Sequence, residues 1–221
     1  MNIAIDGPSG AGKSTVAKQL ATKLRIPYLD TGAMYRAIGL KVYNSKLEAS
    51  DSAKIEKLLP KTKIDMVLAN GETKVMLDDK DVSVDIRQHF MSRIASDVSA
   101  IPAVRIWLVE MQRKIAQNGS CVLDGRDIGS FVLPNAEYKF FLTATSDIRA
   151  KRRHLELTQK GEKTDLAKIK ADIEQRDYND SNRVFAPLKK VDDAIEIDST
   201  DLSIAQVVEQ MLWHISAVGN N

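Results

Sequence analysis

The stretch at residues 7–14 reads GPSGAGKS and matches the pattern G-x-x-x-x-G-K-[ST]. Before it, residues 2–5 (NIAI) form a short apolar run that predicts a strand. After it, residues 13–24 carry apolar side chains at helical spacing, which predicts a helix. A glycine-rich loop between a strand and a helix is typical of an anion-binding turn in an α/β protein, so we expect a parallel sheet.

The same loop predicts that the chain binds a nucleoside triphosphate. Its glycines permit backbone angles closed to other residues, and its N–H groups and the start of the following helix attract phosphate oxygens. Lys13 is expected to reach the β- and γ-phosphates, and the Ser14 hydroxyl to ligate Mg²⁺. These features alone do not distinguish a kinase from a nucleotide-dependent switch or motor.

Composition narrows the class of protein. The chain has 221 residues, of which 43% are apolar and 28% charged, as in ordinary globular proteins. A net charge of +2 does not indicate a nucleic-acid partner, and no apolar run approaches the length of a membrane span. The single cysteine, Cys121, excludes an internal disulfide and fits a reducing compartment. We therefore expect a cytoplasmic protein without a secretory signal or membrane contact.

Further elements follow in alternation. An insert at residues 63–83 alternates apolar and polar residues on both sides of the pair Asn70 and Gly71, which predicts a small antiparallel hairpin. Thr31 is expected to cap a helix that carries Arg36, and Ser146 is expected to cap the helix at 147–160. The other strands are predicted at 26–30, 121–124, 138–143 and 194–198, and the other helices at 84–101, 102–117, 165–183 and 202–218.

Residues 28–36 (YLDTGAMYR) follow a predicted strand and suggest a second anion site. A helix that begins near Thr31 and carries Arg36 just over one turn later has the groups that hold a phosphate. A surface arginine next to a routine helix cap is the simpler alternative.

Residues 122–132 (VLDGRDIGSFV) place three charges directly after another predicted strand. Asp124 has the position of the carboxylate that helps to hold Mg²⁺ in phosphate-loop proteins, although it could instead pair with Arg126 as a structural ion pair. Arg126 lies at the carboxyl edge of a parallel strand, where ligands bind in open α/β sheets, and Asp127 lies one step further out.

Residues 175–183 (QRDYNDSNR) place Arg176, Asp180 and Arg183 on one predicted helical face. The preceding predicted helix carries a further basic cluster, Arg149, Arg152 and Arg153. Two arginine-bearing helices joined at a glycine predict a mobile lid that brings positive charge to a transferring phosphoryl group. Ordinary i,i+4 ion pairs are the alternative, as is nucleic-acid binding by the short basic run.

Four motifs together resemble the bacterial cytidylate kinases. They read IDGPSGAGKST, YLDTGAMYR, DGRDIG and RDYNDSNR…APL, and the resemblance covers essentially the whole chain, including the insert. It implies a P-loop nucleoside monophosphate kinase fold, with a parallel sheet flanked by helices, a small antiparallel insert in the acceptor-binding region and a helical lid. It also implies a cytoplasmic, monomeric enzyme that uses Mg²⁺ to transfer the γ-phosphoryl group of ATP to CMP or dCMP.

The resemblance also assigns roles to residues. The ATP-binding residues are Gly7, Pro8, Ser9, Gly10, Ala11, Gly12, Lys13, Ser14, Thr15 and Arg149. The CMP-binding residues are Thr31, Arg36, Ser96, Arg105, Arg126, Asp127, Arg176, Asp180 and Arg183. The expected catalytic residues are Lys13, Arg126, Arg153 and Arg176. The expected metal ligands follow from position instead: Ser14 from the phosphate-loop motif and Asp124 from the end of its strand.

Within the CMP set, the resemblance gives each part of the nucleotide its partners. Arg36 and Arg126 hold the acceptor phosphate, while Arg176 and Asp180 face the sugar, with Asp180 taking its hydroxyl. Ser96, Arg105 and Asp127 read the cytosine, and Arg183 lies along it. A carboxylate with an arginine and a serine complements the amino group and the two acceptors of cytosine.

Two rival functions remain open from the sequence. One is a kinase of similar architecture that acts on another monophosphate or on a polar metabolite such as shikimate. The other is a nucleotide-dependent switch or RNA-binding module without an acceptor. We expect small-molecule substrates and no nucleic acid, in one domain with a core at 1–30, 84–145 and 188–221, an acceptor-binding region at 31–83 and a lid at 146–187.

Overall fold

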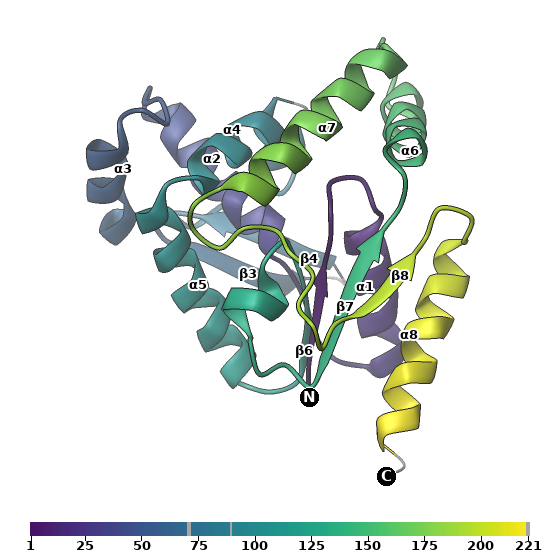
Figure 1. The fold of residues 1–221 in the computed structure, drawn as a ribbon. Coiled ribbons are helices and arrows are strands. Elements are labelled where there is room, and N and C mark those ends of the chain that lie inside the picture. Colours follow the sequence, from purple (N-terminus) through teal and green to yellow (C-terminus); the bar gives the residue numbers. More distant parts are fainter. Residues whose placement is uncertain (70–71, 89, 220–221) are drawn as a thin grey trace. The chain divides into compact units, whose positions relative to one another are not determined.

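A five-stranded sheet forms the centre of the fold, in a computed structural model that describes residues 1–69, 72–88 and 90–219 (Figure 1). Its strands, in spatial order, are β2 (Tyr28–Asp30), β6 (Cys121–Asp124), β1 (Asn2–Asp6), β7 (Tyr138–Thr143) and β8 (Ile195–Asp198). Strand β1 pairs in parallel with β6 and β7, and β7 pairs in parallel with β8. Ile3, Ala4 and Ile5 are fully buried, as in a strand covered on both faces. The predicted parallel sheet is confirmed.

The chain divides into two compact units. The first joins Met1–Tyr28 to Ala116–Asn221, and the second is Leu29–Ile115. The helices of the first unit are α1 (Lys13–Leu24), α6 (Ser146–Gln159), α7 (Leu166–Asn182) and α8 (Ile204–Gly219), with a π-helical turn at Ile128–Val132. Over the described ranges, none of the helices combines the length and apolar character needed to cross a bilayer.

The first unit has two hydrophobic cores. In the larger, α1 and α8 pack together and against the sheet, with fully buried side chains such as Leu20, Val207 and Met211. The smaller lies between α6 and α7 and is formed by Ala150, Leu157, Ile169 and Ile173. The two helices of the predicted lid therefore hold each other through apolar contacts of their own.

The second unit contains helices and an antiparallel sheet. Its elements are α2 (Thr31–Asn44), α3 (Ser52–Leu58), α4 (Met91–Ser99), most of α5 (Pro102–Gln117), 3₁₀ turns at Leu59–Lys61 and Asp85–Arg87, and β3 (Ile64–Ala69), β4 (Glu72–Leu77) and β5 (Lys80–Asp81). Strands β3 and β4 pair with Ile64 opposite Leu77, which confirms the antiparallel insert. The predicted turn at Asn70 and Gly71 lies outside the described residues. Helices α2 and α4 approach closely at Gly39, where a Cβ would lie 3.2 Å from the Ile94 side chain.

Both predicted helix caps are wrong by one residue. Thr31 and Ser146 are the first residues of α2 and α6 rather than their N-caps. Asp30 caps α2, because its side chain accepts a hydrogen bond from the Ala33 N–H at 2.8 Å. Thr145 is the N-cap of α6. In both cases the carboxylate or hydroxyl residue one position earlier already adopts the non-helical conformation that a cap requires.

Two predicted helices are shorter than their apolar pattern indicates. The helix predicted over 84–101 is interrupted, because Gln88 has extended angles (φ −61°, ψ 145°) after the 3₁₀ turn and α4 begins only at Met91. Helix α7 ends at Asn182, and Arg183 is extended at φ −66°, ψ 142°. The chain reverses there because the Leu188 N–H donates to the Asp180 carbonyl at 2.8 Å. Arg183 therefore does not share a helical face with Arg176 and Asp180.

Candidate active site

The phosphate loop between β1 and α1 depends on two glycines for its path. Gly7 has a φ of 145°, and a Cβ there would lie 2.0 Å from the Leu142 carbonyl oxygen on β7. Gly10 has a φ of 78°, and a Cβ there would lie 3.2 Å from the Cβ of Arg149 on α6. Because α1 begins at Lys13, the N–H groups of its first turn lie at the end of this loop. The loop thus has the backbone donors of an anion site.

Lys13 is buried on this loop, with its Nζ donating to the Pro8 carbonyl at 2.7 Å. Burial lowers the pKa of this ammonium well below its usual value, and the charge of Arg126 lowers it further, while the carboxylates of Asp124 and Asp6 oppose the shift. A phosphate group at the loop would supply negative charge to a poorly solvated cation. The arrangement therefore favours anion binding.

Asp124, at the end of β6, lies beside the start of α1. One of its oxygens accepts from the Ser14 hydroxyl at 2.9 Å, and the other accepts from the Tyr28 hydroxyl at 2.8 Å. The parallel pairing of β1 with β6 sets Ile5 opposite Asp124, which is how a distant carboxylate reaches the loop. A hydroxyl and a carboxylate side by side fit Mg²⁺, which binds proteins through one or two such groups and takes its other ligands from phosphate and water.

Asp6, the last residue of β1, fixes the chain after Asp127. Its two oxygens accept hydrogen bonds from the Ile128 N–H at 2.8 Å and the Gly129 N–H at 2.7 Å. Burial raises the pKa of Asp6 to about 6, and the two backbone hydrogen bonds limit that rise. This carboxylate determines the path of the segment that presents Asp127.

A network of buried charges surrounds Asp180 on α7. Arg126 donates from Nε to Asp180 Oδ2 at 2.8 Å, and Arg183 approaches Asp180 Oδ1 at 3.8 Å. The Nε of Arg176 lies 4.0 Å from Asp180 Oδ2. Burial alone would raise the pKa of Asp180, but the three guanidinium groups together hold it below its usual value. We call Arg126, Asp127, Arg176, Asp180 and Arg183 the arginine–carboxylate network.

Asp127 belongs to this network through Arg183, whose NH2 lies 3.3 Å from Asp127 Oδ1. The Nε of Arg183 also donates to the Ala186 carbonyl at 2.6 Å, so the guanidinium is held from two sides. All three charges of residues 122–132 thus have partners outside that stretch: Ser14 and Tyr28 for Asp124, Asp180 for Arg126, and Arg183 for Asp127. The structure brings five predicted CMP-binding residues together.

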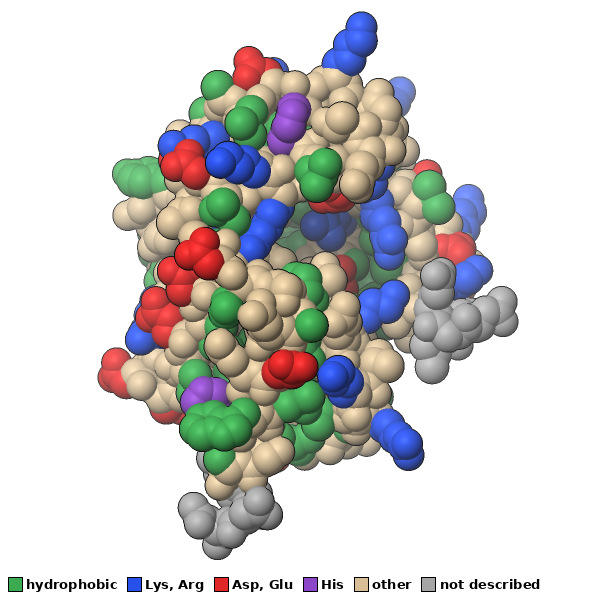
Figure 2. Space-filling view, turned by 90° about the vertical axis from the view of Figure 1, so that its right-hand side faces the viewer, with side chains coloured by type: hydrophobic (Ala, Val, Ile, Leu, Met, Phe, Trp, Pro, Cys, Tyr) green, Lys and Arg blue, Asp and Glu red, His purple; other side chains and the backbone are tan. Residues whose placement is uncertain are grey.

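The predicted lid arginines lie in different surroundings. Arg149 is buried, and its guanidinium donates to the carbonyls of Ser9 and Ala144, both at 2.8 Å. Arg153 instead pairs with Glu156 at 2.7 Å along the same helix. Figure 2 shows Lys and Arg side chains at a hollow on the face that carries α6 and α8. The structure brings Arg149 to the phosphate loop, whereas the contact described for Arg153 is a local helical one.

The remaining predicted acceptor residues belong to the second unit. Arg36 folds back toward the start of α2, where its NH1 lies 3.8 Å from the position that a Gly32 Cβ would take. Thr31 is buried in the same turn. An arginine over a helix N-terminus is a suitable arrangement for a phosphate group.

Arg105 connects three helices of the second unit. Its NH1 donates to the Ser99 carbonyl at the end of α4, at 3.3 Å, and its guanidinium carbon lies 5.3 Å from the centre of the Tyr35 ring on α2. Ser96 lies one turn earlier on α4, where its carbonyl accepts from the Ser99 hydroxyl at 2.8 Å. Arg105 is among the most buried side chains of the protein, at 1% exposure, as expected for a cation with a specific task rather than a surface charge.

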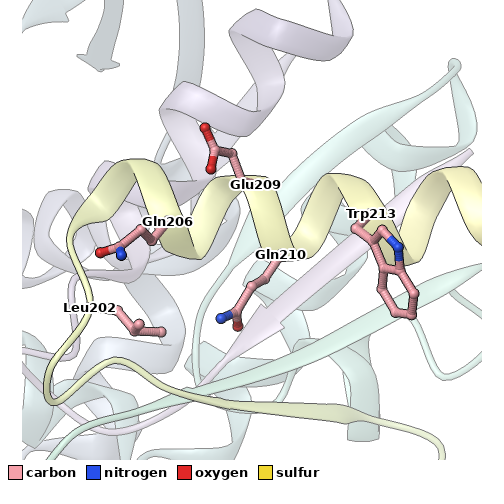
Figure 3. A pocket seen from close by; sticks show the side chains of 5 residues that line it. All are labelled: Leu202, Gln206, Glu209, Gln210 and Trp213. Carbon is pink, nitrogen blue, oxygen red and sulfur yellow. The ribbon is translucent and has the colours of Figure 1, made fainter.

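A groove of about 410 Å³ on the outer side of α8 contains none of the predicted site residues (Figure 3). It is lined by Leu202, Gln206, Glu209, Gln210 and Trp213. Its single charged side chain is acidic, so it does not suit a phosphate.

Sequence reasoning missed two acidic residues at this site, Asp6 and Asp177. Asp6 closes the first predicted strand, and its position beside the phosphate loop was the available signal. Asp177 follows Arg176 directly in a quoted motif, but its partner Ser9 lies 168 residues away along the chain. A single sequence contains no signal for such a pairing.

Comparison with known proteins agrees with this arrangement. The family model described as cytidylate kinase matches residues 3–217. A cytidylate kinase of Caldicellulosiruptor bescii is 52% identical over 96% of this chain and 94% of its own, and one of Halalkalibacterium halodurans is 49% identical over 97% of both. Among solved structures, a gluconokinase of Sinorhizobium meliloti has a TM-score of 0.52 at 13% identity, covering 100% of this chain and 94% of its own, which shows the fold alone. The chain belongs to the cytidylate kinase family.

Proposed function

We propose that the reaction of this family, ATP-dependent phosphorylation of CMP or dCMP, is carried in this chain by the residues assigned above. The chain is a nucleoside monophosphate kinase with ATP as donor. The observation that carries the proposed site is the set of Lys13, Ser14 and Asp124 on a loop with backbone donors. In the reaction, an oxygen of the CMP phosphate forms a bond to the γ-phosphorus of ATP, and the bond to the β-phosphate oxygen breaks to release ADP.

The donor half rests on the phosphate loop. Transfer passes through a loose transition state, so positioning and charge neutralisation carry most of the catalysis. Lys13 neutralises the β- and γ-phosphates, and the backbone N–H groups of residues 10–15 are proposed to donate to them. Mg²⁺ would bind the phosphates and lower the charge on the leaving group, with Ser14 and Asp124 as its protein ligands. Arg153, from the lid, is proposed to add positive charge at the transferring group.

The acceptor half rests on arginines. Arg36 and Arg126 are proposed to hold the CMP phosphate, and Arg176 and Asp180 the sugar. An acceptor that is already an anionic phosphate oxygen needs no strong general base, and no histidine is assigned to the site. The ion pairs within the arginine–carboxylate network orient Arg126 and Arg176 before substrate binds.

Recognition of the base is proposed to depend on Asp127, with Ser96, Arg105 and Arg183. An ionised carboxylate only accepts hydrogen bonds, so it pairs with the amino group of cytosine and opposes the oxygen that uracil has at the same place. Arg183 holds Asp127 in a fixed orientation through the 3.3 Å contact.

The test is an assay of ADP release with CMP, dCMP, UMP, AMP and shikimate as acceptors, with and without Mg²⁺. The wild type should use CMP and dCMP at least tenfold better than the others, and only with Mg²⁺. Asp127→Asn, which offers a donor, should raise the ratio of UMP to CMP turnover by about tenfold or more. Asp192→Asn, at an exposed position of the same unit, is the control. An equal rate of ADP release with and without an acceptor would instead support a nucleotide-dependent switch. An unchanged ratio of UMP to CMP turnover in Asp127→Asn would show that Asp127 does not recognise the base.

We also propose that the enzyme is a cytoplasmic monomer. The buried thiol of Cys121, whose pKa burial raises to about 11, fits a structural thiol in a reducing compartment. Sedimentation at the assay concentration tests the monomer, since a stable dimer would give twice the mass.

A further inference from the structure

Asp177 lies where α7 meets the phosphate loop, and neither the motifs nor the family resemblance gives it a role. One of its oxygens accepts a hydrogen bond from the Ser9 N–H at 3.0 Å. The other receives NH1 of Arg149 on α6. A single carboxylate thus contacts the loop between β1 and α1 and the buried arginine of the neighbouring helix.

Arg149 is held in one orientation by these contacts. Its Nε donates to the Ala144 carbonyl, and its NH1 donates both to the Ser9 carbonyl and to Asp177. The side chain is 8% exposed, so solvent competes little for these donors. Gly10 allows this approach, because a Cβ there would lie 3.2 Å from the Cβ of Arg149. Ser9 is therefore bound on both sides of its peptide, through its N–H by Asp177 and through its carbonyl by Arg149.

The charges of this group balance locally. The carboxylate of Asp177 faces a guanidinium and a backbone N–H, so it adds little net repulsion toward a phosphate on the loop. Without the carboxylate, Arg149 would keep a buried charge without its ionic partner, and the Ser9 N–H would lose its acceptor. Both groups would then be free to take other orientations. The loss of Asp177 would change the geometry of these two groups and keep the fold, since the two apolar cores of the unit do not include Asp177.

We propose that Asp177 is a positioning residue for the ATP half of the reaction: it holds Ser9 and Arg149 in the geometry that receives ATP. The proposal rests on the proposed roles of the phosphate loop and Arg149. The CMP half should be nearly independent of it, because Arg126 and Arg183 are fixed by Asp180 and Asp127 instead.

The experiment measures kcat and the KM for ATP and for CMP separately, in Asp177→Asn and Asp177→Ala. Asparagine can still accept a hydrogen bond from the Ser9 N–H but lacks the negative charge. Alanine lacks both the acceptor and the charge. We expect KM for ATP to rise about tenfold in Asp177→Asn and further in Asp177→Ala, with KM for CMP within twofold of the wild type. Asp177→Glu, which restores the charge, should recover at least half of the loss on a logarithmic scale.

Lys170→Ala is the matched control. It removes a 2.7 Å ion pair between α7 and Asp147 of α6 on the exposed side of the lid, without touching the loop, and should leave both KM values unchanged. A KM for ATP within twofold of the wild type in Asp177→Ala would overturn the proposal. So would equal increases in both KM values, tighter ATP binding, or loss of the fold in both variants. A wild type that shows no CMP-dependent ADP release would instead contradict the proposed function.

Discussion

The phosphate loop and the arginine–carboxylate network lie in the same unit but hold their charges in different ways. At the loop, Lys13 donates to a backbone carbonyl, and Asp124, at the end of β6, accepts hydrogen bonds from the hydroxyls of Ser14 and Tyr28. In the network, charged side chains bind one another: Arg126 donates to Asp180 at 2.8 Å, and Arg183 lies 3.3 Å from Asp127. The loop can therefore lose one charged side chain and keep its backbone, whereas the network loses its balance with any member.

This difference separates activity from stability. A side chain held by backbone groups contributes little to the fold, and a buried cation there even carries a desolvation cost. A side chain held by opposite charges in a buried cluster leaves those charges uncompensated when it is removed. Variants in the two regions should therefore fail in distinct ways.

The largest effect is expected from Lys13→Ala. Turnover should fall by about 10³-fold, because a preorganised charge at the transferring phosphoryl group is lost. The free energy of unfolding should stay the same or increase, since the substitution removes an ammonium whose pKa burial has lowered. Chemical denaturation and the ADP-release assay measure the two quantities, with the exposed Lys18→Ala on the same helix as control. Wild-type turnover in the folded variant would remove Lys13 from catalysis.

Asp180→Asn, unlike Lys13→Ala, should lose much of its stability. At pH 7 the free energy of unfolding should drop by about 3 kcal/mol, because three guanidinium groups keep their charge without the carboxylate. The folded pKa of Asp180 is depressed, so its contribution is present above the pKa of the unfolded chain and is lost as pH falls through the folded value. The difference in the free energy of unfolding between variant and wild type should therefore decrease as pH falls. A difference that stays constant from pH 7 to pH 3 would show that the ionised Asp180 carboxylate does not stabilise the network. Asp172→Asn, at an exposed position of α7, is the control for a substitution on this helix.

Asp6→Asn sharpens the comparison, because Asp6 is a buried carboxylate held by backbone N–H groups. Its folded pKa is raised to about 6 from an ordinary value of 3.8, so its contribution to stability is complete below about pH 4 and is lost as pH rises through 6. The wild type should therefore lose roughly 2 kcal/mol relative to Asp6→Asn between pH 4 and pH 7. Urea unfolding of both proteins across this range measures the difference, in which all other titrating groups cancel. If the wild type instead gains stability relative to Asp6→Asn as pH rises, Asp6 is stabilised as the anion.

Much of the site could be predicted because its signals are local. The loop at residues 7–14 determines its own conformation and the strand and helix beside it, and Asp124 follows from its position at the end of a strand. The partners of the network could not be predicted in the same way. Arg126 was considered beside Asp124 and Asp127, but it binds Asp180, which is 54 residues further along the chain.

The predicted helix boundaries were wrong where the apolar pattern and the backbone conformation differ. Helical periodicity continues through Gln88 and Arg183, but both residues have extended backbone angles, which apolar spacing does not report. The caps at Thr31 and Ser146 were displaced by one residue because two suitable side chains are adjacent in each case, and local preference does not choose between them.

The central position of β1 has a consequence for the order in which the protein is made. Asn2 pairs with Cys121 and Ile3 with Tyr138, so β1 is synthesised well before both of the strands that pair with it. The second unit, at Leu29–Ile115, is complete before those two strands are made. During synthesis this unit can fold while β1 is still unpaired, and the phosphate loop is assembled afterwards, when β1 pairs with β6 and β7. A ribosome stalled as soon as Ile115 has emerged would expose the complete second unit before β6 and β7 can pair with β1.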